Sequence, residues 1–241
     1  GLGDVYKRQT YNKILPILIF LTLSLSFNIS KAATGTPTSY FNTIYAVNLC
    51  GPGSSLTECL DPVVLGTNAD GTTFDLGAIS AGASAGSLGN LNKAQSGVTY
   101  SFAQIVLSRA FTMTGTVGSC VTKTGADFDI TSPAVVGGAS SGTAVSQIIG
   151  VPSGATIDSN MIGTTSTNGI NGADNSSGNG NIANGEPNMK FRFALATPLT
   201  LKNGRLPTFE IAFDLSAGIS FSANCTSSVT PGPPVVTASF K

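Results

Sequence analysis

The 241-residue sequence contains no histidine and no tryptophan, and only 10% of its residues are charged. Without histidine, the chain lacks the usual general base and the Ser–His and Cys–His pairs of nucleophilic catalysis. A zinc site would need cysteine or carboxylate ligands throughout, and no cysteine pair has the two-to-four-residue spacing of such sites. We therefore expect a protein that is not an enzyme and that binds no cofactor.

Net charge is also lacking, because twelve basic residues balance twelve acidic ones. Such a chain has no electrostatic footprint for nucleic acid or for an anionic membrane. Soluble domains usually carry about 25% charged residues. Scarce charge is tolerated when neighbouring subunits cover much of the surface, or when hydroxyl and amide side chains keep it hydrated. Composition alone leaves both explanations open.

The N-terminal residues are expected to lie outside the folded domain. Residues 1–9, GLGDVYKRQ, resemble the translation of a transposase adapter used in DNA library preparation, and we exclude them from fold reasoning. Residues 10–32 have the parts of a Sec signal peptide: Lys13, an apolar run, and small residues before a cleavage site between Ala32 and Ala33. The apolar run is short for a membrane span of about 20 residues. We expect cleavage, no retained membrane segment, and an extracellular or cell-surface location.

Four cysteines remain in the exported chain: Cys50, Cys59, Cys120 and Cys225. An even number of cysteines in an exported chain indicates disulfides, and four cysteines allow three pairings. A Gly- and Ser-rich turn favours Cys50–Cys59, because it would bring two antiparallel strand ends together, and this leaves Cys120–Cys225. The chain-entropy model gives about 2.7 kcal/mol for the short loop and about 4.8 kcal/mol for the long one.

Apolar and polar residues alternate along most of the mature chain, as is typical of half-buried β-strands. In residues 40–49 this alternation places Tyr45, Val47 and Leu49 on one face. In residues 98–113 the alternation changes phase near Ala103, which indicates a β-bulge or a strand break. Arg109 falls among the apolar positions of that segment, and we expect it at an edge or in a snorkelling position, with a buried ion pair as the alternative.

Turn signals separate the strands, and no stretch of ten or more residues has helical periodicity outside the signal peptide. Residues 68–71, Asn-Ala-Asp-Gly, predict a turn between two strands, and residues 126–131 predict a short strand. Residues 163–188 are rich in Gly and Asn and predict a long flexible loop or insertion. Together these patterns predict an all-β fold, an antiparallel β-sandwich stapled by disulfides, as a single domain over residues 33–241.

Two segments resemble known families. FDLGAI (74–79) followed by SGVTYSFAQIVLS (96–108) is similar to a pattern in secreted bacterial prealbumin-like or Ig-like sandwich domains. This resemblance covers residues 72–113 and implies a fold rather than an activity. The closing VVTASFK (235–241) resembles the C-terminal strand of chaperone–usher pilins, which alternates and carries an aromatic residue next to last. Those pilins usually have one disulfide in another arrangement.

Two functions fit these observations. The first is a structural subunit of an extracellular filament, pilus-like fibre or surface layer, which self-associates when a terminal strand completes a neighbour's sheet. The residues expected to take part are Tyr45, Val47 and Leu49 in the first strand, and Val236, Ala238 and Phe240 in the last. The alternative is a monomeric adhesin or glycan-binding module that meets a cell-surface partner through residues 163–188.

Three aspartates are candidate calcium ligands. Asp127 and Asp129 lie two apart on one expected strand face, and Asp174 lies within the Gly- and Asn-rich segment. The spacing around Asp174 does not match the twelve-residue EF-hand pattern. A solvated strand face and a disordered loop explain these residues better than a metal site does, so we expect no bound metal.

Overall fold

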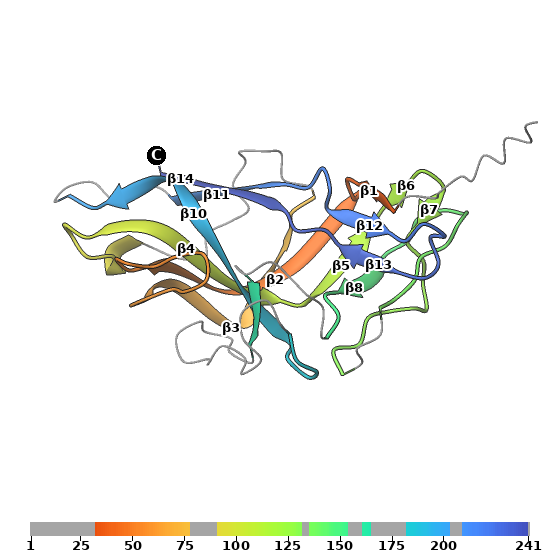
Figure 1. Ribbon diagram of the computed structural model, residues 1–241, viewed down its shortest axis with the longest axis horizontal. Coiled ribbons are helices and arrows are strands. Elements are labelled where there is room, and N and C mark those ends of the chain that lie inside the picture. The colour runs from red at the N-terminus through yellow and green to blue at the C-terminus, as the bar shows by residue number, and fades with distance from the viewer. Residues whose placement is uncertain are drawn as a thin grey trace, which may run out of the picture.

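The computed structural model describes residues 32–77, 91–131, 135–153, 161–164, 182–202 and 209–240. Within them the chain is built of antiparallel β-strands, and a single-turn 3-10 helix, η1 (Leu91–Lys93), is the one helical element (Figure 1). None of the described helices is long and apolar enough to cross a membrane. Residues 1–31, which include the adapter-like segment 1–9 and nearly all of the expected signal peptide, lie outside the described residues.

The larger layer is a seven-stranded antiparallel sheet around a central strand, β2 (Ser39–Cys50). Along one edge β2 pairs with β3 (Val63–Asp75), and along the other with β5 (Ala110–Thr114) and then β4 (Thr99–Ser108). Outside these, β10 (Asn188–Thr200) pairs with β4, β9 (Met161–Thr164) with β10, and β8 (Gln147–Gly150) with β5. Both edges of β2 are therefore occupied within the chain.

The second layer is narrower and consists mainly of a long hairpin, which we call the C-terminal ribbon. Its first arm is β11 (Phe209–Asp214) and β12 (Ile219–Phe221), and its second arm is β13 (Val229–Pro231) and β14 (Val235–Phe240). β11 pairs with β14, and β12 pairs with β13 and with β1 (Ala33–Gly35). Figure 1 shows the ribbon running along one side of the large sheet, with β14 in contact with β10 and β13 in contact with β8. Two short strands, β6 (Thr116–Val117) and β7 (Cys120–Val121), pair with each other.

Side chains from both layers meet in one hydrophobic core. The large sheet contributes Ile105, Leu107 and Phe111 among others, and the ribbon contributes Phe213 and Phe221. Two antiparallel layers with interdigitated inner faces are the architecture of a β-sandwich. The all-β, sandwich-like fold expected from the alternating sequence is confirmed.

Two disulfides join the chain, in the pairing that the sequence favours. The short-loop disulfide, Cys50–Cys59, closes the connection between β2 and β3, with a Cα–Cα distance of 5.0 Å. The long-loop disulfide, Cys120–Cys225, links β7 to the turn between the two arms of the ribbon across 105 residues. Disulfides of this kind are compatible with an extracellular location.

The face assignment expected for β2 is wrong because the strand contains a β-bulge. Its register against β4 shifts between Ile44 and Ala46, so that one residue, Tyr45, is inserted. The bulge changes the phase of the strand: Ile44 before it and Val47 and Leu49 after it pack in the same core. Tyr45 therefore does not share a face with Val47 and Leu49.

Residues 68–71 do not form a turn between two strands; they lie inside β3, where its register against β2 shifts. The Asn68 Nδ2 donates a hydrogen bond to the carbonyl oxygen of Gly71 at 2.8 Å, and Gly71 has a φ of 74°, a backbone conformation that glycine adopts without strain. On either side of these four residues, β3 continues to pair with β2. The extra residues form a bulge that the sheet accommodates at its edge.

Three further local expectations are changed by tertiary pairing. Residues 126–131 are not a strand, although the Phe128 backbone N–H donates to the Ile148 carbonyl at 2.9 Å. β4 runs unbroken past Ala103, and the register shift lies in its neighbour β10. The ends of the expected 163–188 loop belong to the fold, since β9 extends to residue 164 and Ile182 is only 2% exposed.

Candidate functional site

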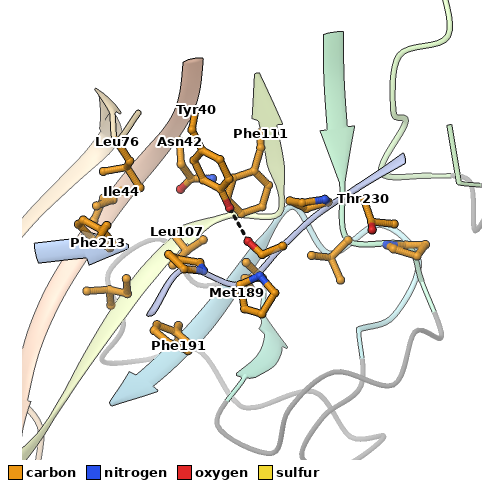
Figure 2. A pocket seen from close by; sticks show the side chains of 17 residues that line it. Tyr40, Asn42, Ile44, Leu76, Leu107, Phe111, Met189, Phe191, Phe213 and Thr230 are labelled. Atoms are coloured by element: carbon orange, nitrogen blue, oxygen red, sulfur yellow. Dashed lines mark hydrogen bonds between the residues drawn. The ribbon is translucent and has the colours of Figure 1, made fainter. Parts of the chain in front are cut away.

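An apolar cavity of about 310 Å³ lies between the large sheet and the C-terminal ribbon (Figure 2). Side chains of β2, β4, β5 and β10 form one side of it, and Phe213 and the segment Pro231–Pro234 form the other. None of the lining side chains is charged. The cavity is therefore a partly open, apolar space between the two layers that water-soluble ions would find unfavourable.

Proline and glycine explain why the ribbon arches at this point. β13 and β14 follow one another on the second arm of the ribbon. Proline has no backbone N–H, so Pro231, Pro233 and Pro234 cannot donate hydrogen bonds to the first arm in this stretch. The Gly232 N–H still donates to the Gly218 carbonyl at 2.8 Å. A Cβ on Gly232 would overlap the carbonyl oxygen of Ala217, so the close approach of the two arms requires glycine here.

Tyr40 joins the sheet to the ribbon beside the cavity. Its hydroxyl donates a hydrogen bond to the Gly232 carbonyl at 3.2 Å, and the ring packs edge-on against Phe111 with centroids 5.2 Å apart (Figure 2). Burial raises the pKa of the Tyr40 phenol well above its ordinary value of 10.0. The phenol is therefore a neutral hydrogen-bond donor at physiological pH.

Asn42 is one of three polar residues in the lining, with Tyr40 and Thr230, and it is only 3% exposed. Its Nδ2 donates to the carbonyl oxygens of Ser108 at 2.9 Å and Ala110 at 3.3 Å, which fixes the orientation of the amide. Its Oδ1 is buried and accepts no hydrogen bond from the described residues. An acceptor without a donor is costly in an apolar interior, and this oxygen is enclosed by the protein.

Arg109, between β4 and β5, is fully buried, and the expectation of an edge or snorkelling position is wrong. Its guanidinium donates to four acceptors: the carbonyl oxygens of Ala183 (2.8 Å), Glu186 (2.9 Å) and Ile130 (3.2 Å), and the Oγ of Ser153 (3.0 Å). It also lies over the Phe128 ring, 5.1 Å from the centroid. Burial lowers the pKa of Arg109, and the charge of the nearby Glu186 opposes this shift. The side chain joins three chain segments from inside the fold.

The residues expected to exchange strands lie in very different places. Val47 and Leu49 are core residues of the central strand β2, and Tyr45 is the bulge residue of that strand. β14, by contrast, pairs with β11 along one edge, and no strand in the described part of the chain pairs with its other edge. Within β14, Ala238 is buried and Val236 is half-buried, and the backbone of Phe240 pairs with that of Phe209.

The calcium candidates are not brought together. Asp127 and Asp129 are exposed; Asp127 Oδ1 accepts a hydrogen bond from the Ile148 N–H at 2.9 Å, and Asp129 accepts from the backbone and hydroxyl of Thr131. These bonds lower the pKa of Asp129. In the ranges that the structure describes, no group of three or more Cys, Asp or Glu side chains could hold a metal ion. Asp174 lies outside those ranges.

The sequence interpretation did not single out the polar residues of the cavity. A signal was present for Asn42, because it is an amide between Tyr40 and Ile44 on an alternating strand face. Nothing in the local sequence shows that Gly232, 192 residues from Tyr40, lies opposite. No family model, no curated protein and no solved structure matches this chain, so its function has to be argued from its own geometry.

Proposed function

We propose that the chain is exported through its Sec signal peptide and serves as a non-enzymatic structural subunit that assembles with copies of itself outside the cell. Assembly would occur by strand addition at β14. The observation that carries this proposal is that β14 pairs with β11 along one edge, while no described strand pairs with its second edge.

An open strand edge is a template for a further strand, because its backbone N–H and C=O groups lack partners in the sheet. Monomeric proteins usually protect such edges with charged residues, proline or bulges. β14, with the sequence VVTASF, contains none of these, and its first residue, Val235, is 65% exposed. The low overall charge also favours a surface that neighbouring copies cover.

The exchange centres on β14 rather than on β2. Moving β2 into a neighbour would break its pairing with β3, β4 and β5 at once. It would also remove Val47 and Leu49 from the core. Addition at the edge of β14 breaks none of the pairs within the chain, so it has the smaller cost.

The test compares two lysine substitutions of exposed apolar residues in the purified, disulfide-bonded protein. Val235→Lys places a charge on the open edge, whereas Leu56→Lys changes a 43%-exposed side chain in the short disulfide loop. Light scattering after size exclusion, with electron microscopy of concentrated samples, measures assembly. We expect oligomers or fibres for the wild type and Leu56→Lys, and mainly monomer for Val235→Lys.

Two outcomes would contradict the proposal. The wild-type protein could stay monomeric at high concentration, or Val235→Lys and Leu56→Lys could reduce assembly to the same extent. A monomer whose melting temperature rises with a glycan would instead support the adhesin function. Export is tested separately, by mass spectrometry of the native protein. The expected result is a chain that begins at Ala33 and has no free thiol.

A further inference from the structure

We propose that the cavity beneath the C-terminal ribbon binds a medium-length aliphatic chain that has one uncharged polar end. The chain enters with its apolar end first, and its polar end stays in solvent at the mouth of the cavity. This inference goes beyond the proposed assembly and does not rest on it. It follows from the closed apolar end of the cavity, the position of its mouth and its volume.

The inner end of the cavity offers a ligand no polar contact among the described residues. Ile44, Leu107 and Met189 form its floor, since they lie opposite one another on three neighbouring strands. The Tyr40 hydroxyl already donates to a carbonyl of the ribbon, and Asn42 Oδ1 has practically no accessible surface. A polar group carried to this end would lose its hydration without gaining a partner. The part of the ligand that lies here must therefore be apolar.

The mouth lies where the lining residues keep contact with solvent. The lining residues that belong to strands of the large sheet are buried. By contrast, the rim, which we define as residues 151–152 and 230–234, is half-buried or exposed at every position except Gly232. Figure 2 shows Thr230 on the opposite side of the view from Ile44. The polar end of a ligand therefore keeps its hydration at the rim.

The rim also selects the chemistry of the polar end. Four of its seven residues are prolines, which have no backbone N–H, and none of the described lining residues is charged. A carboxylate at the mouth would find neither a counter-charge nor a row of donors there. A hydroxyl needs neither, because water at the mouth satisfies it, so a neutral polar end fits better.

The volume of the cavity sets the length of the chain. A dry protein cavity of about 150 Å³ lined by aliphatic and aromatic side chains holds one benzene molecule. The volume here, about 310 Å³, is about twice as large. It therefore accommodates a chain of roughly ten to twelve carbon atoms.

Other classes of ligand fit this lining less well. Most hydroxyls of a sugar would have no partner in the apolar interior. An inserted peptide strand would bring an N–H and a C=O at every residue, and the lining offers few groups to bond them. A chain that is apolar except at one end avoids both costs, because its length separates the buried end from the hydrated one.

Alcohols of six, eight and ten carbons test the inference on the purified, disulfide-bonded protein. Isothermal titration calorimetry measures the affinity and the number of sites, and the shift in melting temperature is a second readout. We expect one site per chain and an affinity that rises about fourfold with each added CH₂ group, or about fifteenfold from 1-octanol to 1-decanol. The comparison probe, 1,10-decanediol, has the same chain with a hydroxyl at both ends. It should bind at least about fivefold more weakly than 1-decanol, because one hydroxyl would be buried without a partner.

Two phenylalanine variants locate the site. Val151→Phe adds a ring to a half-buried residue of the rim. We expect it to weaken 1-decanol binding more than about tenfold, because the ring takes space that the chain needs. Ile148→Phe is the matched control, since Ile148 is 38% exposed and does not line the cavity. This variant should bind 1-decanol as the wild type does, and circular dichroism checks that both variants are folded.

Three results would overturn the inference: no binding of 1-decanol, equal binding of 1,10-decanediol, or equal affinity of Val151→Phe and Ile148→Phe for 1-decanol. If Val151→Phe does not fold, the ranking of 1-decanol and 1,10-decanediol on the wild type still decides. None of these results depends on whether the protein assembles by strand addition.

Discussion

Replacing Arg109 by methionine should destabilise the fold strongly, because this side chain connects segments that are far apart in the sequence. It lies at the junction of β4 and β5, and its guanidinium reaches carbonyl groups of Ile130, Ala183 and Glu186. Methionine has similar length and fills irregular space well. The substitution therefore removes the charge and the hydrogen bonds while it keeps most of the packing.

The magnitude follows from the four hydrogen bonds of the guanidinium. Charge-assisted bonds contribute about 1.5–3 kcal/mol each, which gives an upper limit of about 6–12 kcal/mol. The variant also avoids the cost of burying a cation, which amounts to several kcal/mol. However, it leaves the carbonyl oxygens of Ala183 and Glu186 without the guanidinium donor that they share. Each buried group left without a partner costs about 1–3 kcal/mol, and after the avoided cost of charge burial we expect a net loss of about 3–5 kcal/mol.

The assay is urea unfolding followed by circular dichroism, with thermal unfolding as a second readout. A loss of about 3–5 kcal/mol corresponds to a fall of roughly 6–20 °C in melting temperature for a domain of this size. Lys93→Met, which removes an exposed charge, is the control and should change stability by less than about 0.5 kcal/mol. Arg109→Lys should also destabilise, since an ammonium cannot reproduce the planar fork. A loss below about 1 kcal/mol for Arg109→Met would refute the reasoning.

Three further predictions concern the disulfides and two titrating groups. Replacing both cysteines of Cys120–Cys225 by alanine should lower the free energy of unfolding by about 4.8 kcal/mol, against about 2.7 kcal/mol for the short-loop disulfide; urea titrations that reverse this order would contradict the loop-length argument. Tyr40→Phe should cost about 0.5–1.5 kcal/mol near neutral pH. Because burial raises the pKa of Tyr40 above its unfolded value, the unfolded state loses the phenolic proton first. The wild type should therefore lose stability above about pH 10. A difference in the free energy of unfolding between the wild type and Tyr40→Phe that stays constant at higher pH would contradict this prediction. The Ser216 N–H donates to Asp214 Oδ1 at 2.8 Å and lowers the pKa of that carboxyl. The ionised Asp214 should therefore stabilise the fold fully above about pH 3.9, and this stabilisation should be lost at lower pH. An NMR titration of the Asp214 carboxyl with an unshifted midpoint would exclude this stabilisation.

The strands were largely predictable because alternation is a local property of the chain. A half-buried strand must place apolar residues on every second position, and the segments around Val47, Leu107 and Val236 show this pattern. The cysteine pairing was predictable for a related reason. A short polar turn favours Cys50–Cys59 among the three possible pairings, and the other two cysteines then have only each other; the structure has this pairing.

The site was not predictable to the same degree, because its residues meet only through long-range contacts. Asn42 is an ordinary polar residue in the sequence, and it becomes significant when Ser108 and Ala110 hold its amide in place. Arg109 was misplaced for the opposite reason. Its position on the apolar face was clear, but the carbonyl groups that solvate it come from loops 21 and 77 residues away.

The sequence by itself determined that the chain forms short antiparallel strands, that its sulfurs are paired, and that its chemistry lacks a histidine-based catalyst. Composition and period-two alternation are sufficient for such conclusions, because they depend on neighbouring residues and on side-chain type. Only the tertiary structure decided which face of β2 is buried, how Arg109 is solvated and where a cavity remains. The buried face of β2 depends on its β-bulge, and the solvation of Arg109 depends on carbonyl groups of distant loops. The cavity depends on the interruption of the ribbon between β13 and β14. A shift of one residue within a strand would move every side chain beyond it to the other face.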